Sequence, residues 1–184
     1  MRKSFCLASA SPRRRDILKK YGYEFTVLPA DIDESVPSDL DVNEIPLYLA
    51  RKKARAVADK TGEITLGSDT IVVLDGKVLG KPESPAENEE YLKMLSGKTH
   101  FVYTGYCVIA GDDEYSGVDR AAVTFRKLSF SDIAEYVSSG NGLDKAGGYG
   151  VQDGYGLVKS VDGEFETVVG LPITKVNAIL EKIL

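Results

Sequence analysis

The order of strand-like and helix-like segments is the feature that most limits which folds this chain can adopt. Phe5 to Ala8 is a short apolar strand candidate, and Ser11 followed by Pro12 predicts a helix that runs to Gly22. Further strands are predicted at 24–28, 64–74, 77–79, 101–110 and 121–125, with helices at 46–60, 84–97, 129–137 and from Pro172 onward. This alternation indicates an α/β or α+β protein with a mixed sheet, as one domain of residues 1–184.

Composition excludes several classes of protein. The chain has 184 residues, 28% of them charged, and a formal net charge of −5, so no basic surface favours a general nucleic-acid or membrane-surface binder. Cys6 and Cys107 lie in apolar strand-like runs, which indicates buried thiols in a reducing compartment. Because no segment resembles a signal peptide or a membrane span, we expect a cytoplasmic protein with no membrane partner.

Three consecutive arginines, Arg13 to Arg15, lie in the first turn of the helix predicted after Ser11. The free N–H groups at this end of a helix carry roughly half a positive charge, so cations are unfavourable there. Asp16 compensates only one of the three arginines. Because helix N-termini and guanidinium groups both bind phosphate, this turn predicts an anion-binding site.

Three other candidate motifs do not hold. Gly97-Lys98-Thr99 resembles the end of a phosphate-binding P-loop, but Leu92 stands where the earlier glycine is required. The glycines of the loop 146–156 do not follow the spacing of the dinucleotide-binding fingerprint. The single histidine, His100, cannot build a zinc site, so a structural role is the better interpretation.

Asp69 lies inside the apolar run 64–74, which we expect residues 67–70 to interrupt. A buried carboxylate is costly unless it is paired, hydrogen-bonded or bound to a metal, so Asp69 is a candidate catalytic residue. The alternative is a turn carboxylate that caps its own backbone. Gly67 predicts a bend where the backbone approaches another group closely.

Other charged residues suggest a common site. Glu34 follows a predicted strand, although alone it fits a solvated loop acid; Lys53 fits the polar face of a helix, and Lys81 fits a turn. Together with the arginines they offer basic groups for a polyphosphate and carboxylates for a divalent cation. Mg²⁺ held by one or two carboxylates and substrate phosphates is the usual arrangement for nucleotide hydrolysis.

A set of short motifs, in a fixed order along nearly the whole chain, resembles the Maf family. These are ASASPRR at 8–14, LARKKA at 49–54, GSDT at 67–70, LGKP at 79–82, LSG at 95–97, AGGYGVQ at 146–152 and VGLP at 169–172. The resemblance implies a nucleoside triphosphate pyrophosphatase with an association with septum formation. It implies an elongated, twisted mixed sheet flanked by helices, with two lobes around a cleft, similar to inosine triphosphate pyrophosphatases. A homodimer is a reasonable expectation from the same resemblance.

The resemblance also implies roles for individual residues. Asp69 matches the general base and, with Glu34, a site for Mg²⁺ or Mn²⁺. The matched substrate-binding positions are Ser9, Arg13, Arg14, Lys53 and Lys81. Arg13, Thr70 and Gln152 match the three specificity residues of the branch of the family that prefers dTTP and UTP.

Two residues depart from the family pattern. Asp153, beside Gln152, stands where a small residue is expected, and it could alter contacts with the base or face solvent. Asn88 replaces an expected alanine on the helix before Gly97, which bears on packing.

The expected reaction is attack of water on a phosphorus of the triphosphate, which breaks the bond between the α and β phosphates. Asp69 accepts the proton of water, and the basic residues stabilise charge. Two other functions fit the same residues. One is a nucleotide- or nucleic-acid-binding regulator of septum formation without turnover. The other is a phosphomonoesterase, which would release orthophosphate instead of pyrophosphate.

Overall fold

The computed structural model describes residues 4–184, which form two compact units built from non-contiguous segments. Unit 1 contains the chain up to Asp69, together with Thr104–Asp119 and Gly170–Leu184. Unit 2 contains Thr70–Tyr103 and Arg120–Val169.

The strands of residues 4–184 form one mixed sheet, which confirms the predicted α/β class. They are β1 Phe5–Leu7, β2 Phe25–Val27, β3 Thr65–Leu74, β4 Lys77–Leu79, β5 Thr99–Ala110, β6 Asp113–Phe125 and β7 Val158–Asp162. Their order is β2-β1-β3-β5-β6-β7, with β4 also paired to β3. β1 is parallel to β2 and β3, whereas β4 and β7 are antiparallel to β3 and β6.

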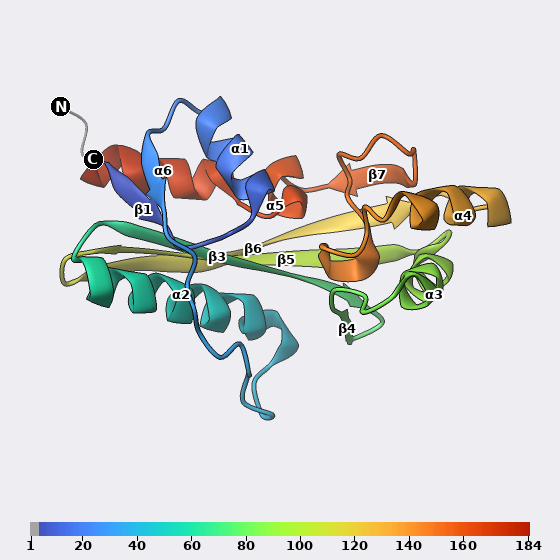
Figure 1. The fold of residues 1–184 in the computed structure, drawn as a ribbon, viewed down its shortest axis with the longest axis horizontal. Coiled ribbons are helices and arrows are strands. Elements are labelled where there is room, and N and C mark those ends of the chain that lie inside the picture. Colours follow the sequence, from blue (N-terminus) through green and yellow to red (C-terminus); the bar gives the residue numbers. More distant parts are fainter. Residues whose placement is uncertain (1–3) are drawn as a thin grey trace. The chain divides into compact units, whose positions relative to one another are not determined.

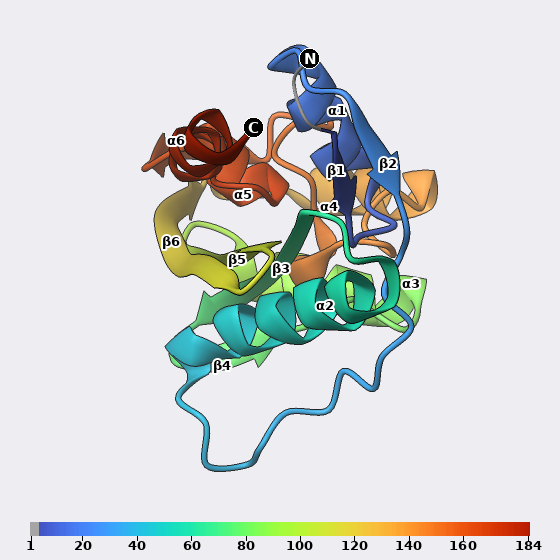
Figure 2. The ribbon, with the colours of Figure 1, turned by 90° about the vertical axis from the view of Figure 1, so that its left-hand side faces the viewer.

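In unit 1, helices cover both faces of the strands. α2 (Ile45–Thr61) lies on one face, and α1 (Pro12–Lys20) and α6 (Ile173–Ile183) lie on the other (Figures 1 and 2). Two glycines bring α2 close: a Cβ at Gly67 would overlap the carbonyl of Ala50, and a Cβ at Gly105 would overlap the backbone of Pro46. The bend predicted at Gly67 is therefore a close helix–strand contact inside a continuous strand.

Unit 2 has its own hydrophobic core. It is built from strands and from α3 (Pro85–Leu95) and α4 (Phe130–Ser139), and its largest fully buried side chain is that of Tyr136. Phe125 packs edge-on against Tyr149, with ring centroids 4.7 Å apart. A short helix, α5 (Phe165–Val169), which the sequence did not predict, follows β7.

The local signals gave mixed results. Gly62 ends α2 in the left-handed conformation, and Asp75 and Gly76 form the predicted turn between β3 and β4, both with positive φ. Ser129 caps α4 through a complete capping box with Asp132. In contrast, the predicted interruption of β3 at residues 67–70 is wrong, because the strand is continuous from Thr65 to Leu74.

The two serine caps predicted for α1 and α3 differ from expectation. Ser11 occupies the N-cap of α1 without a side-chain cap bond; its own N–H donates to Ser9 Oγ at 3.2 Å. Ser84 caps α3 by accepting from the N–H of Glu87, whereas the Glu87 carboxylate accepts from the N–H of Glu83 and not from that of Ser84. Cys6 and Cys107 are buried free thiols, as predicted. Within residues 4–184, no helix has the length and apolar content needed to cross a membrane.

Candidate functional site

The three arginines at the start of α1 are not equally accessible. Arg14 is buried, and its Nε donates to the carbonyl oxygen of Gly170 at 2.7 Å while its Nη1 donates to Ser9 Oγ at 2.9 Å. Arg13 and Arg15 are half-buried. The predicted anion site therefore contains one arginine held firmly by the protein itself and two that are more accessible.

Burial lowers the pKa of Arg14, and the negative charge of Asp69 offsets part of that effect. Ser68 connects the two residues structurally, because its hydroxyl donates to the same Gly170 carbonyl at 3.1 Å and also to Gly105 at 2.8 Å. The carbonyl group of Gly170, just before α6, thus binds side chains from both the start of α1 and the middle of β3.

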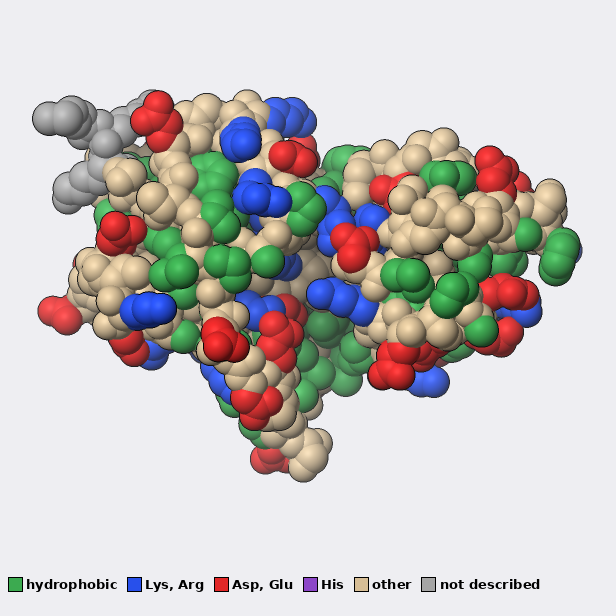
Figure 3. Space-filling view, viewed as in Figure 1, with side chains coloured by type: hydrophobic (Ala, Val, Ile, Leu, Met, Phe, Trp, Pro, Cys, Tyr) green, Lys and Arg blue, Asp and Glu red, His purple; other side chains and the backbone are tan. Residues whose placement is uncertain are grey.

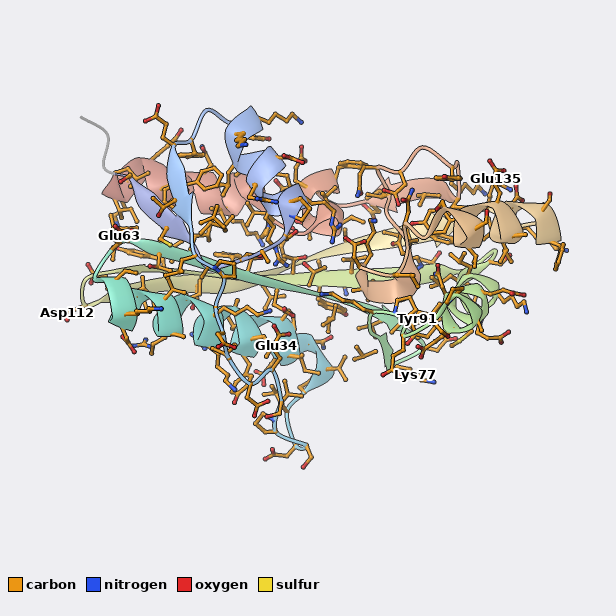
Figure 4. The ribbon with its side chains drawn as sticks, viewed as in Figure 1. Glu34, Glu63, Lys77, Tyr91, Asp112 and Glu135 are labelled. Carbon is orange, nitrogen blue, oxygen red and sulfur yellow. The ribbon has the colours of Figure 1, made fainter. Side chains whose placement is uncertain are left out.

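Asp69 is buried in β3 and pairs with a lysine of α2. Lys53 Nζ lies 2.6 Å from Asp69 Oδ1 and 3.0 Å from Glu34 Oε1. Glu34 comes from the loop that precedes α2, where Asp and Glu side chains gather on the surface (Figures 3 and 4). We call Arg14, Lys53, Asp69 and Glu34 the ion cluster.

Local sequence explains why this pair forms. Lys53 lies between Ala50 and Ala54, the small residues of α2 that allow the helix to approach Gly67. Gly67 and Asp69 are two residues apart in β3, so their side-chain positions face the same helix. A buried lysine and a buried carboxylate on facing elements satisfy each other, which makes the pairing of Asp69, and not a turn, its structural role.

The two carboxylates predicted to hold a divalent cation both contact a lysine. Glu34 Oε1 and Asp69 Oδ1 lie 3.0 and 2.6 Å from Lys53 Nζ, so both are paired with one positive charge. Among the described residues, no group of three or more acidic, histidine or cysteine side chains is placed to hold a metal alone. A cation at this site would need its remaining ligands from phosphate and water.

The remaining predicted site residues belong to unit 2. Thr70 is half-buried in β3, whereas Lys81 and Gln152 are exposed on loops. The two loops are joined, because the N–H of Gly147 donates to the carbonyl of Gly80 at 3.0 Å. Lys81 and Gln152 thus lie on segments that are hydrogen-bonded to each other.

The sequence did not predict which residues position the side chains of the candidate site. Ser68, the Gly170 carbonyl and Tyr136 contact site-bearing segments, but no spacing pattern signals such contacts. Ser68 and Gly170 lie within matched motifs, which was the one available signal. His100 has the structural role expected of it: it is fully buried, with Nε2 2.6 Å from the Tyr149 hydroxyl, and burial lowers its pKa to about 4.

Comparison with known proteins places this chain in a family. A family model described as Maf-like protein matches residues 4–183. A dTTP/UTP pyrophosphatase of Moorella thermoacetica is 49% identical over 178 residues, covering 95% of this chain and 92% of the relative. A dTTP/UTP pyrophosphatase of Thermus thermophilus is 47% identical over 176 residues, covering 95% and 91%. The solved structure of a HAM1 protein from Coxiella burnetii has the same fold, with 17% identity and a TM-score of 0.53 over 98% of this chain and 99% of that one. The chain therefore belongs to the Maf family.

Proposed function

We propose that this chain hydrolyses nucleoside triphosphates to the monophosphate and pyrophosphate, with dTTP and UTP as preferred substrates. Relatives at 47% and 49% identity carry the name dTTP/UTP pyrophosphatase over nearly the full length of both chains. The observation that carries the proposal is the pairing of Asp69 with Lys53 at 2.6 Å, beside a buried arginine at a helix N-terminus. This pairing supports the proposal that Asp69 is the base and that the neighbouring cations of the same unit bind phosphate.

In the proposed mechanism, Asp69 accepts a proton from the water that attacks phosphorus. Lys53 fixes the orientation of the Asp69 carboxylate, and the accessible Arg13 contacts the triphosphate while Arg14 adds positive charge from below the surface. Glu34 and Asp69 would hold Mg²⁺ or Mn²⁺, which would neutralise phosphate charge. Fixed positive groups stabilise the charge that develops as the bond between the α and β phosphates breaks.

Base preference is assigned to a second group of residues. Gln152 is exposed on its loop and carries both a hydrogen-bond donor and an acceptor, which suits the edge of a pyrimidine. We propose that Gln152, Thr70 and Arg13 select dTTP and UTP, and that Ser9 and Lys81 contribute to phosphate binding. Ser9 does so through Arg14, because the Ser9 hydroxyl oxygen accepts a hydrogen bond from Arg14 Nη1.

A panel of nucleoside triphosphates, assayed with Mg²⁺ and with Mn²⁺ for both pyrophosphate and orthophosphate, tests the proposal. We expect pyrophosphate and monophosphate, with UTP and dTTP turned over faster than GTP. Release of orthophosphate would indicate a phosphatase, and tight binding without turnover would indicate a nucleotide-binding regulator. Equal rates for UTP and GTP would overturn the base preference while leaving the reaction in place.

A further inference from the structure

Asp153 and Asn88 each make a hydrogen bond that links one segment of unit 2 to a neighbouring helix. This segment, residues 146–156, carries Gln152, and we call it the Gln152 loop. Gly147 and Gly148 both have φ of 71°, a conformation that residues with side chains disfavour and that glycine adopts readily.

Asp153 turns inward although its neighbour Gln152 is exposed. Its side chain is only 10% exposed, and it accepts a hydrogen bond from the Tyr136 hydroxyl at 2.6 Å. It packs against Gly150 so tightly that a Cβ there would lie 2.5 Å from its carboxylate oxygens. The possibility that Asp153 merely faces solvent is therefore excluded.

Tyr136 ties α4 to the backbone of the loop. Its hydroxyl accepts from the N–H of Gly150 at 2.9 Å while donating to Asp153, so one oxygen holds the loop on both sides of Gln152. Burial and the bond to Asp153 raise the pKa of Tyr136 far above its usual value, which keeps the phenol protonated and able to donate. Lys145 Nζ, 3.6 Å from Asp153 Oδ2, supplies the opposite charge.

Asn88 holds the beginning of the same loop. It is fully buried on α3, and its side-chain N–H donates to the carbonyl of Gly148 at 2.6 Å. Side chains at Gly142 or Gly148 would collide with it. An alanine at this position could not make the bond, so Asn88 provides a second attachment of the loop.

We propose that Asp153, Tyr136 and Asn88 act as positioning residues that fix the Gln152 loop and thereby set how strongly this enzyme prefers its nucleobase. The inference rests on the proposed function, because it concerns the recognition of the same substrate. The physical reason is that an amide on a loop already held in one conformation loses less entropy when it binds a base. Loss of one such hydrogen bond corresponds to a factor of roughly 5 to 10 in affinity.

Amide hydrogen exchange tests the attachment without any assay of activity. Tyr136→Phe removes the acceptor of the Gly150 N–H, so exchange across residues 147–156 should accelerate at least several-fold while exchange in α2 stays unchanged. Asn88→Ala should give the same result around Gly148. Unchanged exchange in both variants would show that the loop does not depend on these side chains, which would overturn the inference.

Steady-state kinetics test the consequence for recognition. Asp153→Gly should raise KM for UTP about tenfold and leave kcat within about twofold, so that the preference for UTP over GTP falls. Asp153→Asn retains an oxygen that accepts from Tyr136 and should recover most of the preference. Glu135→Gln, an exposed acid on α4 next to Tyr136 in sequence (Figure 4), is the matched control and should change neither.

A double variant decides whether Asp153 acts through Gln152. In a Gln152→Ala background, Asp153→Gly should add no more than about twofold, because the residue that it positions is gone. Full additivity, or an unchanged UTP preference in active Asp153→Gly, would overturn the inference and leave the proposed function standing. A wild-type protein that releases no pyrophosphate would instead refute the proposed function, while hydrogen exchange would still decide whether the attachment exists.

Discussion

The ion cluster of unit 1 and the Gln152 loop of unit 2 are built on opposite principles. The ion cluster joins charged side chains on a helix and a strand that pack closely, with Lys53 between two carboxylates. The Gln152 loop has no regular strand or long helix and is held by side chains that bond to its backbone. The ion cluster thus gathers charge between closely packed elements, whereas hydrogen bonds to its backbone hold the Gln152 loop. The proposed function assigns phosphate chemistry to the first and selection of the base to the second.

The largest effect should come from breaking the central ion pair. Lys53→Met leaves Asp69 buried without its partner and should lower the free energy of unfolding by about 3 kcal/mol. Adding Asp69→Asn should restore a large part of that loss, since the charge left unpaired is then removed. Denaturant unfolding measures both, with the exposed Lys60→Met on the same helix as the control. If Lys53→Met unfolded like Lys60→Met, the pair would carry no weight in stability.

A smaller effect should follow when α2 is pushed away from β3. Gly67→Ala places a Cβ against the carbonyl of Ala50 and 2.7 Å from the backbone nitrogen of Ala54. We expect a loss of about 1–3 kcal/mol in unfolding free energy and a lower kcat, because Lys53 moves with the helix. Gly80→Ala, where the same Cβ meets no described atom within 4 Å, should be nearly neutral in stability. Equal stability of the two variants would contradict the close packing.

The smallest of these effects concerns unit 2 and appears only in acid. His100 is neutral in the folded protein because burial lowers its pKa from 6.5 to about 4. The unfolded chain binds a proton near pH 6.5, so the free energy of unfolding is greatest above that value and falls as the pH drops toward 4. Between pH 6.5 and 5 this residue should account for about 1.5 kcal/mol.

His100→Gln removes the titrating group and should flatten that part of the pH profile. Because His100 contacts Tyr149 of the Gln152 loop, acid should also accelerate amide exchange there before it affects α2. Parallel pH profiles of wild type and His100→Gln would show that another group causes the acid sensitivity.

Parts of this structure that depend on local signals were predictable from sequence. Gly62 ends α2 and Asp75-Gly76 makes its turn because those signals act over a few residues. The continuity of β3 through Ser68 and Asp69 was not predictable. These residues are poor strand formers, and their partners, Gly170 and Lys53, are distant in sequence.

The candidate site shows the same division. Asp69 was recognisable as a costly carboxylate in an apolar run, and family motifs supplied the residues that accompany it. The hydrogen bond of Asp153 was not predictable, because its partner Tyr136 is 17 residues away. Tyr136 lies on an amphipathic helix, and that pattern alone explains why Tyr136 is buried. Sequence patterns identify which side chains are unusual, whereas tertiary contacts decide what those side chains bind.

The most direct test of the account is the turnover of Asp69→Asn. This change keeps the shape of the side chain and removes its basic oxygen, so a folded variant should release pyrophosphate from UTP about 10² to 10⁴ times more slowly than wild type. Asp59→Asn, an exposed carboxylate on α2, should retain the wild-type rate. A folded Asp69→Asn protein with wild-type kcat would contradict the assignment of the ion cluster as the catalytic centre.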